Sequence, residues 1–510
     1  MRRVAFGIIL VSLALAAGCG GGGSASSKVP ATVTLTPSVG RSINAGSTLT
    51  INAAASDGSL VTWTVSGAGT LANATQLPNQ PPNVATYLAP SFTGQNAYAV
   101  VTATTASGAS AYLPLTVVPF NVFGNVQGVS VDGGPSSHSY PNAAFTSVDV
   151  CTTGSTNCKT INGILVDTGT VGLRILASAL PTLTPVKDSS GDILNECFQF
   201  EDQSYIWGQV ELADVRINGE IAASLPIQAI ADPSGYSIPS DCAATGTEGD
   251  KDSLDALGAN GILGIGVEPQ DCGAACVAAA GATPPGAAYY TCTGGSCTAA
   301  FASLAQQVNH PATFFGIDNN GTVLQLPSVS GSAGNLTGFL TFGVGTQSNN
   351  QIGTQTIFTL DANDNFTVKL SETGQTLTSS FLDSGSNAFF FPDDAITTCA
   401  SPYALFFCPA APISLTVTSI GVNKSQDTNY FTIDNASDLL TNNPGDVAFS
   451  GLGGPNGTGL CSDGTGACSF IFGVPFFYGR TIFTTVRGQS PPINTPAAPW
   501  WAYTTSFPAP

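Results

Sequence analysis

Two short acidic motifs contain the residues of this sequence that are best suited to chemistry. Asp167-Thr168-Gly169 and Asp383-Ser384-Gly385 each follow an apolar run, and they stand more than two hundred residues apart. If the chain brings them together, the two carboxyls can share one proton, because like charges at short range cannot both ionise. One carboxyl can then take a proton from a water molecule while the other hydrogen-bonds the carbonyl group that the water attacks. Such a pair suits the hydrolysis of a peptide bond.

Neither motif is specific by itself, because Asp and Gly are also the residues of ordinary hairpin turns. Other catalytic chemistries have less support in the sequence. A serine or cysteine triad needs a histidine base, and the chain has only His138 and His310. The same scarcity of histidine, without any repeated Cys-x-x-Cys pair, argues against a metal site. We therefore expect neither a metal nor a cofactor.

The segments around the two motifs resemble those of the pepsin-like aspartic proteases, over roughly residues 121–510. In that family each half has a second apolar-apolar-Gly segment beside the catalytic loop, and Ile262-Leu263-Gly264 and Ile471-Phe472-Gly473 match it. Further segments follow in the family's order. They are the opening hairpin (144–169), the strand pair after the flap (207–219), the start of the second lobe (338–347) and the short helix after the second motif (392–398).

The resemblance implies a bilobal, double-β-barrel fold and an aspartic endopeptidase that acts on a peptide or protein substrate. Asp167 and Asp383 would be its catalytic residues. Thr168 and Ser384 would lock the two loops across the lobes, and Gly169 and Gly385 would let backbone N–H groups approach the carboxylates. The residue after the first motif is Thr170, where the family most often has Ser. A non-catalytic relative, which binds peptide or glycan in the same cleft or inhibits another enzyme, is the alternative.

The flap that covers the cleft in this family is harder to place. Three aromatic candidates lie close together in the segment 198–208: Phe200, Tyr205 and Trp207. We favour Tyr205 as the flap aromatic. A segment rich in Ala and Gly (274–297) resembles an insertion, which could narrow the cleft.

The composition favours an all-β protein with minor helix. Charged residues make up 9% of the chain, and Gly (58) and Pro (33) are abundant, which suits strands joined by many turns. Short helices are expected at 298–308, 392–398 and 436–441. The net charge of −19 repels phosphate backbones, so a nucleic acid is not an expected partner.

The chain divides into an N-terminal module and two lobes. Residues 30–118 contain no Cys and read as short strands at the spacing of a β-sandwich, with Trp63 as the core aromatic. This stretch resembles bacterial Ig-like domains, whose role would be that of a spacer or a carbohydrate-facing module. The two lobes are expected at 119–330 and 331–510, and we expect a monomer.

The N-terminus has the features of an export signal. Arg2 and Arg3 precede an apolar run (4–17) that is short for a membrane span, and residues 1–19 end in Ala-Ala-Gly-Cys. Small residues before Cys19 resemble the bacterial lipobox, which implies a lipid anchor at Cys19 and, by analogy, the outer membrane or cell surface. A simple secretory peptide is the alternative. Residues 20–29 then form a flexible tether.

Twelve cysteines remain after Cys19, an even number that suggests disulfides in an exported chain. Sequence alone does not determine their connectivity. Close neighbours suggest five loop-closing pairs, and the two remaining cysteines would pair by elimination. The neighbours are Cys151 and Cys158, Cys272 and Cys276, Cys292 and Cys297, Cys399 and Cys408, and Cys461 and Cys468; Cys197 and Cys242 remain.

Overall fold

The computed structural model describes residues 30–72, 83–90, 96–118, 123–136, 138–231, 236–243, 249–279, 281–456 and 469–504. Strands dominate throughout, and the helices are single turns or little more, which confirms the all-β class. The expected signal segment and tether, with Cys19, and the cysteines Cys461 and Cys468 lie outside the described residues.

The N-terminal module is a sandwich of two four-stranded sheets, which contains the expected short strands. Its core lies between the sheets, and Trp63 is buried there with Ile51, Tyr87 and Leu113. One sheet has the order β1 (Val33–Thr36), β3 (Thr48–Ala55), β6 (Val84–Leu88), β5 (Thr70–Ala72). The other has the order β2 (Arg41–Asn44), β8 (Ser110–Val118), β7 (Ala97–Thr105), β4 (Val61–Gly67).

After the sandwich, the strands of the first half of the remaining chain belong to one long, continuous sheet. In spatial order its strands are β19 (Ser296–Ala299), β18 (Tyr289–Thr293), β14 (Ile193–Gln199), β15 (Tyr205–Ile217), β16 (Glu220–Ile230), β12 (Val171–Leu176), β17 (Gly261–Ile265), β11 (Cys158–Asp167), β10 (Phe145–Thr152) and β9 (Val126–Val131). The short strand β13 (Thr184–Pro185) pairs with β15.

The same sheet continues from β9 into strands that connect the two halves. The order runs on through β22 (Leu336–Phe342), β20 (Gly321–Leu326), β32 (Arg480–Thr485), β33 (Trp500–Thr504) and β23 (Thr356–Thr359). This connecting sheet draws strands from both sides of residue 330, so the expected lobe boundary does not coincide with a break in hydrogen bonding.

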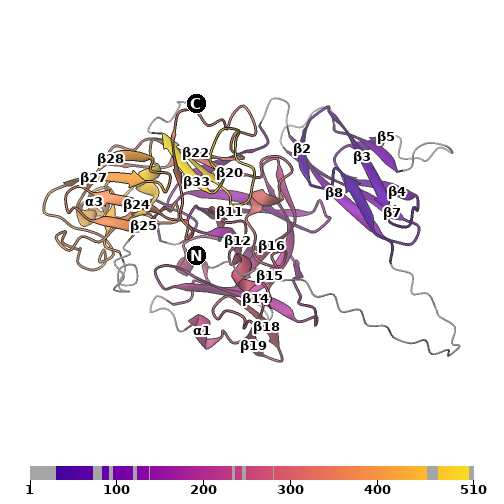
Figure 1. Ribbon diagram of the computed structural model, residues 1–510, viewed down its shortest axis with the longest axis horizontal. Helices are drawn as coiled ribbons and strands as arrows, with labels where there is room; N and C mark the ends of the chain where they lie inside the picture. Colours follow the sequence, from indigo (N-terminus) through magenta and orange to yellow (C-terminus); the bar gives the residue numbers. More distant parts are fainter. Residues whose placement is uncertain are drawn as a thin grey trace, which may run out of the picture.

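A separate seven-stranded sheet forms the body of the second half, drawn in orange in Figure 1. Its order is β28 (Gln426–Ile433), β27 (Ile413–Ile420), β24 (Phe366–Leu370), β25 (Thr376–Leu382), β31 (Ile471–Phe472), β26 (Phe389–Phe390), β30 (Gly453–Gly454). The strands β21 (Ser332–Ala333) and β29 (Ala448–Phe449) form a two-stranded sheet. The α-helices are α1 (Ser240–Ala243), α2 (Leu254–Leu257), α3 (Ala436–Asn442) and α4 (Val474–Phe477).

Of the three expected helices, only the last forms. Helix α3 confirms the prediction at 436–441, and the Asn435 side chain caps its N-terminus. The prediction at 298–308 is wrong, because Ser296–Ala299 pairs with β18 as a hairpin across the Cys292–Cys297 disulfide. The segment 392–398 forms a turn instead of a helix, and the Asp393 carboxylate there accepts a hydrogen bond from the Ala395 N–H.

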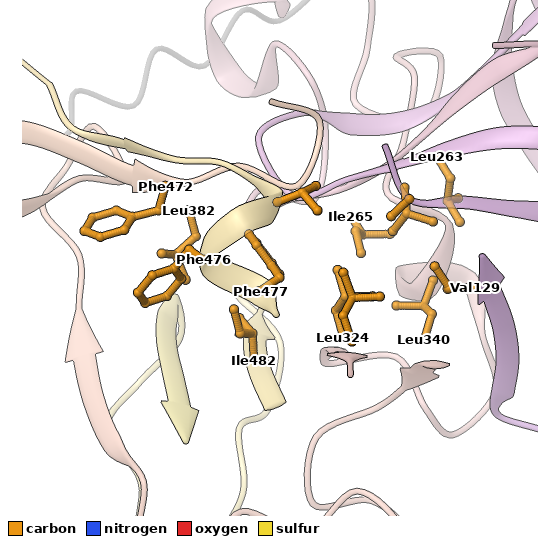
Figure 2. Packing of buried hydrophobic residues seen from close by; sticks show 14 of the residues in the cluster. Val129, Leu263, Ile265, Leu324, Leu340, Leu382, Phe472, Phe476, Phe477 and Ile482 are labelled. Atoms are coloured by element: carbon orange, nitrogen blue, oxygen red, sulfur yellow. The ribbon is translucent and has the colours of Figure 1, made fainter. Parts of the chain in front are cut away.

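A single hydrophobic core runs through both halves. Figure 2 shows Leu263 and Ile265 of β17 near the connecting strands, with Phe472 of β31 and the α4 side chains on the other side. Fully burying an aliphatic or aromatic side chain of this size stabilises the fold by about 1.5–3 kcal/mol. The two halves are therefore held together by shared packing as well as by the connecting sheet.

Within the described residues five disulfides form, each between the cysteines expected to pair. They are Cys151–Cys158, Cys197–Cys242, Cys272–Cys276, Cys292–Cys297 and Cys399–Cys408. None of the helices in the described part of the chain combines the length and apolarity needed to span a bilayer.

The sandwich is docked against the first half of the remaining chain, as Figure 1 shows for β8 beside β16. Arg216 of β15 is buried at this contact, where its Nη1 donates to the Leu115 carbonyl at 2.8 Å and its guanidinium lies 4.4 Å from the centre of the Tyr98 ring. The Tyr112 hydroxyl donates to Asp214 Oδ1 at 3.0 Å. These buried polar contacts fix the sandwich in place, in contrast to a loosely tethered spacer.

Candidate active site

The first acidic motif lies at the end of a buried strand. β11 pairs in parallel with β17, so that Asp167 lies opposite Gly264, and β12 runs antiparallel on the far side of β17. The backbones pass very close here, since a Cβ at Gly264 would lie 2.7 Å from the Val171 backbone. Glycine is therefore required in this second apolar segment for the chain to thread beside the Asp167 loop.

The second motif repeats this arrangement in the other half. β25 pairs in parallel with β31, with Leu382 opposite Phe472, and β26 runs antiparallel on the far side of β31. The Asp383 N–H donates to the Phe472 carbonyl at 3.0 Å. A Cβ at Gly473 would lie 2.2 Å from the Ala388 carbonyl oxygen, so this glycine has the same steric role as its counterpart in the first half.

Four buried hydrogen bonds join the two loops symmetrically. The Thr168 hydroxyl donates to the Leu382 carbonyl at 3.0 Å and accepts from the Ser384 N–H at 2.9 Å. In the other direction, the Ser384 hydroxyl donates to the Val166 carbonyl at 2.7 Å and accepts from the Thr168 N–H at 3.0 Å. Each hydroxyl thus bonds the backbone of the opposite loop, and the two loops are fixed to each other.

The carboxyl groups of Asp167 and Asp383, called here the aspartate pair, lie against each other's loops. A Cβ at Gly169 would lie 2.6 Å from Asp383 Oδ1, and a Cβ at Gly385 would lie 2.6 Å from Asp167 Cγ. Only glycine leaves room for the opposite carboxyl at these two positions.

Each carboxyl is also held by its own loop. The Gly169 N–H donates to Asp167 Oδ1 at 2.8 Å, and the Thr170 hydroxyl donates to Asp167 Oδ2 at 2.7 Å. The second loop supplies the same two donors to Asp383 from the Gly385 N–H, at 2.9 Å, and the Ser386 hydroxyl, at 2.6 Å. The hydroxyl of Thr170 therefore matches that of a serine at the equivalent place.

The electrostatics of the aspartate pair favour a shared proton. Burial, the charge of Asp383 and a hydrogen bond between the two carboxyls together raise the pKa of Asp167 to about 8, against the lowering effect of the Thr170 and Gly169 donors. At neutral pH Asp167 therefore retains a proton, which it can share with Asp383. Such a pair can both accept a proton from a bound water and donate a hydrogen bond to a second group.

The three aromatic flap candidates lie on a hairpin formed by β14 and β15, and they face opposite sides of it. Tyr205 and Trp207 pack beside the Cys197–Cys242 disulfide, and Trp207 contacts the Tyr290 ring edge-on at 5.4 Å. Phe200, at the start of the turn, packs instead against the cluster around Leu165, next to the aspartate pair. The favoured candidate, Tyr205, thus lies on the face of the hairpin that packs on the disulfide.

Sequence reasoning missed two residues that lie beside the aspartate pair. Tyr140 packs on the same cluster as Phe200, and the charges of Asp383 and Asp167 contribute to raising the pKa of its hydroxyl. Burial and the charge of Asp383 raise the pKa of Glu201, which lies in the hairpin turn. Nothing in the sequence around Tyr140 marks it, because it stands in a Ser- and Pro-rich loop before β10 and its position depends on long-range packing.

The 274–297 segment extends the hairpin sheet. β18 pairs with β14, and β19 pairs with β18, so the hairpin becomes part of a four-stranded layer. Beneath it the buried Arg174 of β12 donates to Glu196 of β14 at 2.6 Å and to Asp271 at 3.0 Å, and the Tyr289 hydroxyl donates to Asp271. These contacts brace the hairpin at its base.

Of the two histidines, His310 caps a short 3₁₀ turn. His310 is fully buried, and its Nδ1 accepts a hydrogen bond from the Ala312 N–H at 3.1 Å at the start of a short 3₁₀ turn. Among the described residues, no group of three or more His, Cys, Asp or Glu side chains is arranged to hold a metal ion.

The fold and the site together define an all-β protein in which two halves each contribute one member of a closely packed aspartate pair. The chain belongs to the family described as "Protein of unknown function (DUF3443)", whose family model matches residues 121–503. The match begins just after the sandwich and ends within β33. The comparison with curated proteins gives no match.

Proposed function

We propose that this chain is an aspartic endopeptidase of the pepsin-like type, which hydrolyses peptide bonds with a water activated by Asp167 and Asp383. One observation carries the proposal: each of the two carboxyls packs on the glycine of the opposite loop, while Thr168 and Ser384 cross-link the loops. The parallel pairing of each Asp strand with an apolar-apolar-Gly strand supports the pepsin-like fold.

The reaction follows from one proton held by two carboxyls. The ionised carboxyl takes a proton from the water as the water oxygen bonds to the scissile carbonyl carbon. The proton already on the pair moves to the carbonyl oxygen, which gives a neutral diol. The pair then takes a proton from one diol hydroxyl and gives one to the amide nitrogen as the C–N bond breaks. The pair ends with one proton, as it began.

The packing around the pair suits this chemistry. Val166 and Leu382, directly before the two aspartates, are buried, so the strands that end in the aspartates lie in an apolar core. Low local polarity strengthens the interaction between the two acids and between each acid and the substrate. The backbone and hydroxyl donors keep both carboxyls oriented without reorganisation during the reaction.

The remaining assignments follow from this proposal and the sequence. The N-terminal sandwich is proposed to be an Ig-like module, and the chain is proposed to be exported and held in the cell envelope by a lipid on Cys19. A peptide or an unfolded protein is the proposed substrate. The acid-rich composition of the chain agrees with work at acidic pH, where the surface carboxylates are partly neutralised.

The test is a comparison of Asp-to-Asn variants at and away from the pair. Asp167→Asn and Asp383→Asn should each abolish cleavage of an unfolded protein at pH between about 3 and 6, because neither retains two acids that share a proton. Asp394→Asn, at an exposed turn position, is the matched control and should leave the rate unchanged. Melting curves verify that all three variants are folded.

Two results would argue against the proposal. Undetectable cleavage by the wild-type chain, or cleavage that persists in the Asp167 and Asp383 variants, would refute an aspartic peptidase. If the wild-type chain instead binds a pepstatin-type inhibitor without any turnover, the non-catalytic peptide-binding alternative is correct.

A further inference from the structure

Tyr140 lies in a loop that passes close to the aspartate pair. Its backbone N–H donates to the Gly133 carbonyl at 2.8 Å, which closes the loop on itself just before β10. Its ring contacts the segment before β17, since a Cβ at Gly258 would lie 3.8 Å from Tyr140 Cδ1. The ring also packs on the cluster that contains Leu165, two residues before Asp167.

Asn142 anchors the same loop to the second half of the chain. Its Nδ2 donates to the Asn387 carbonyl at 2.8 Å and to the Phe449 carbonyl at 2.9 Å, and its Oδ1 accepts from the Phe449 N–H and the Tyr478 hydroxyl, both at 2.7 Å. Asn142 is fully buried and adopts a positive φ of 55°, which Asn tolerates better than most residues. The anchor point at Asn387 lies four residues after Asp383.

Tyr140 is therefore held between the two loops that carry the aspartate pair. Tyr140 packs on the cluster that contains Leu165, just before the first loop, and Asn142 hydrogen-bonds the Asn387 carbonyl, just after the second. Phe200 of the hairpin turn packs on the same cluster as Tyr140. The 138–142 loop, the hairpin turn and the two Asp loops thus lie close together at the pair.

The hydroxyl of Tyr140 is a hydrogen-bond donor at every pH where the pair shares its proton. Burial and the charges of Asp383, Asp202 and Asp167 together raise the pKa of Tyr140 to about 12. Glu201, beside Asp202 in the hairpin turn, adds another acid near the pair. The phenol therefore stays neutral among these carboxylates and can donate to a substrate carbonyl without competing for the shared proton.

We propose that Tyr140 is a substrate-binding residue, whose ring bounds the pocket at the aspartate pair and whose hydroxyl donates a hydrogen bond to the bound peptide. The proposal rests on the peptidase function proposed above and adds a residue from outside the β14–β15 hairpin. Tyr205, by contrast, packs beside the Cys197–Cys242 disulfide on the other face of that hairpin.

The kinetic test compares two Tyr140 variants of the full chain with a matched control. Tyr140→Phe should lower kcat/KM about tenfold, mainly through KM, because a hydrogen bond kept throughout the reaction is lost. Tyr140→Ala should lower it about a hundredfold, because the wall of the pocket is lost as well. Tyr430→Phe removes a hydroxyl from a side chain that is 74% exposed on β28 and should leave both constants unchanged.

A purely structural role for Tyr140 gives a different pattern. In that case Tyr140→Phe would keep the wild-type KM, and any loss would appear as a lower fraction of active, folded protein. Wild-type kinetic constants in both Tyr140→Phe and Tyr140→Ala would overturn the proposal.

A second measurement separates this proposal from the proposed function. In ¹³C-labelled tyrosine spectra, the Tyr140 Cζ signal, assigned by its loss in Tyr140→Phe, should shift as the aspartate pair titrates. The pH dependence of this shift should change in Asp167→Asn, which leaves Asp383 as the one acid of the pair. A signal that does not follow the pair overturns the placement of Tyr140 at the substrate site. If the signal follows the pair but the wild-type chain neither cleaves protein nor binds the inhibitor, the proposed peptidase function is refuted. The proposed contact between Tyr140 and a substrate is then refuted as well.

Discussion

Replacement of Gly385 by Ala tests the close approach of the two acids most directly. The new Cβ would lie 2.6 Å from Asp167 Cγ and 2.7 and 2.9 Å from its two carboxylate oxygens. Non-bonded carbon and oxygen atoms in proteins prefer separations of roughly 3.5 Å, so the Asp167 carboxyl must move by about 0.5–1 Å. Because the φ of Gly385 does not lie in the left-handed region, the effect is one of space and not of backbone strain.

The displacement should reduce activity far more than stability. A misplacement of about 1 Å at a reacting group costs on the order of a hundredfold in rate, while overpacking of one methyl group costs about 1–3 kcal/mol of folding free energy. As the two carboxyls separate, their mutual repulsion weakens, so the pKa of Asp167 should fall below its value of about 8. The alkaline limb of the activity profile should shift to lower pH with it.

The assay is the pH dependence of kcat/KM on an unfolded protein substrate, with melting curves for each variant. Gly445→Ala is the control, because a Cβ there meets no atom within 4 Å and the residue is exposed. A folded Gly385→Ala chain with activity within about twofold of the wild type and an unshifted profile would refute the close packing of the acids.

Three further predictions concern the stability of the fold. Ser384→Ala leaves the Val166 carbonyl and the Thr168 N–H without their buried partner, so the free energy of unfolding should fall by about 2–4 kcal/mol, measured by chemical denaturation. Burial lowers the pKa of His310 from 6.5 to about 4, so the unfolded chain binds a proton on this side chain more readily than the folded chain. The free energy of unfolding should therefore fall by about 3 kcal/mol as the pH drops from about 6.5 to about 4. The decline should be smaller in a folded His310→Asn variant. Burial and the charge of Asp318 raise the pKa of Glu220 to about 8, so the folded chain keeps a proton that the unfolded chain loses above the ordinary pKa of 4.5. The free energy of unfolding should therefore fall as the pH rises from about 4.5 to about 8. A Glu220→Gln variant should show a shallower fall over that range.

The parts of the site that sequence could predict are those set by local pattern. An apolar strand that ends in Asp-Thr/Ser-Gly and a separate apolar-apolar-Gly strand indicated which segments would meet, and β11 pairs with β17 as β25 pairs with β31. Four of the described disulfides followed from short spacings in turn-rich loops and the Cys197–Cys242 pair by elimination, and the described cysteines pair as expected.

Other features depend on contacts that no local pattern encodes. The position of Tyr140 is set by Asn142, whose partners lie about 250 to 340 residues further along the chain. The 298–308 helix was predicted from Ala-rich composition, but the Cys292–Cys297 hairpin takes the start of that segment into a strand. Strand register determines the face of the hairpin on which Tyr205 lies, and a one-residue shift in register would place its side chain on the opposite face.

The crossed arrangement of the two Asp loops also bears on how such an activity could be kept in check. A chain that is still being made has its first acid long before the second one exists, and it lacks the hydroxyl and the glycine that the partner loop supplies. Neither half alone has the two carboxyls that could share a proton. In the proposed peptidase the chemistry can begin only when synthesis has passed Ser386 and both halves have closed on each other, so a chain that stops before Ser386 is expected to be inactive.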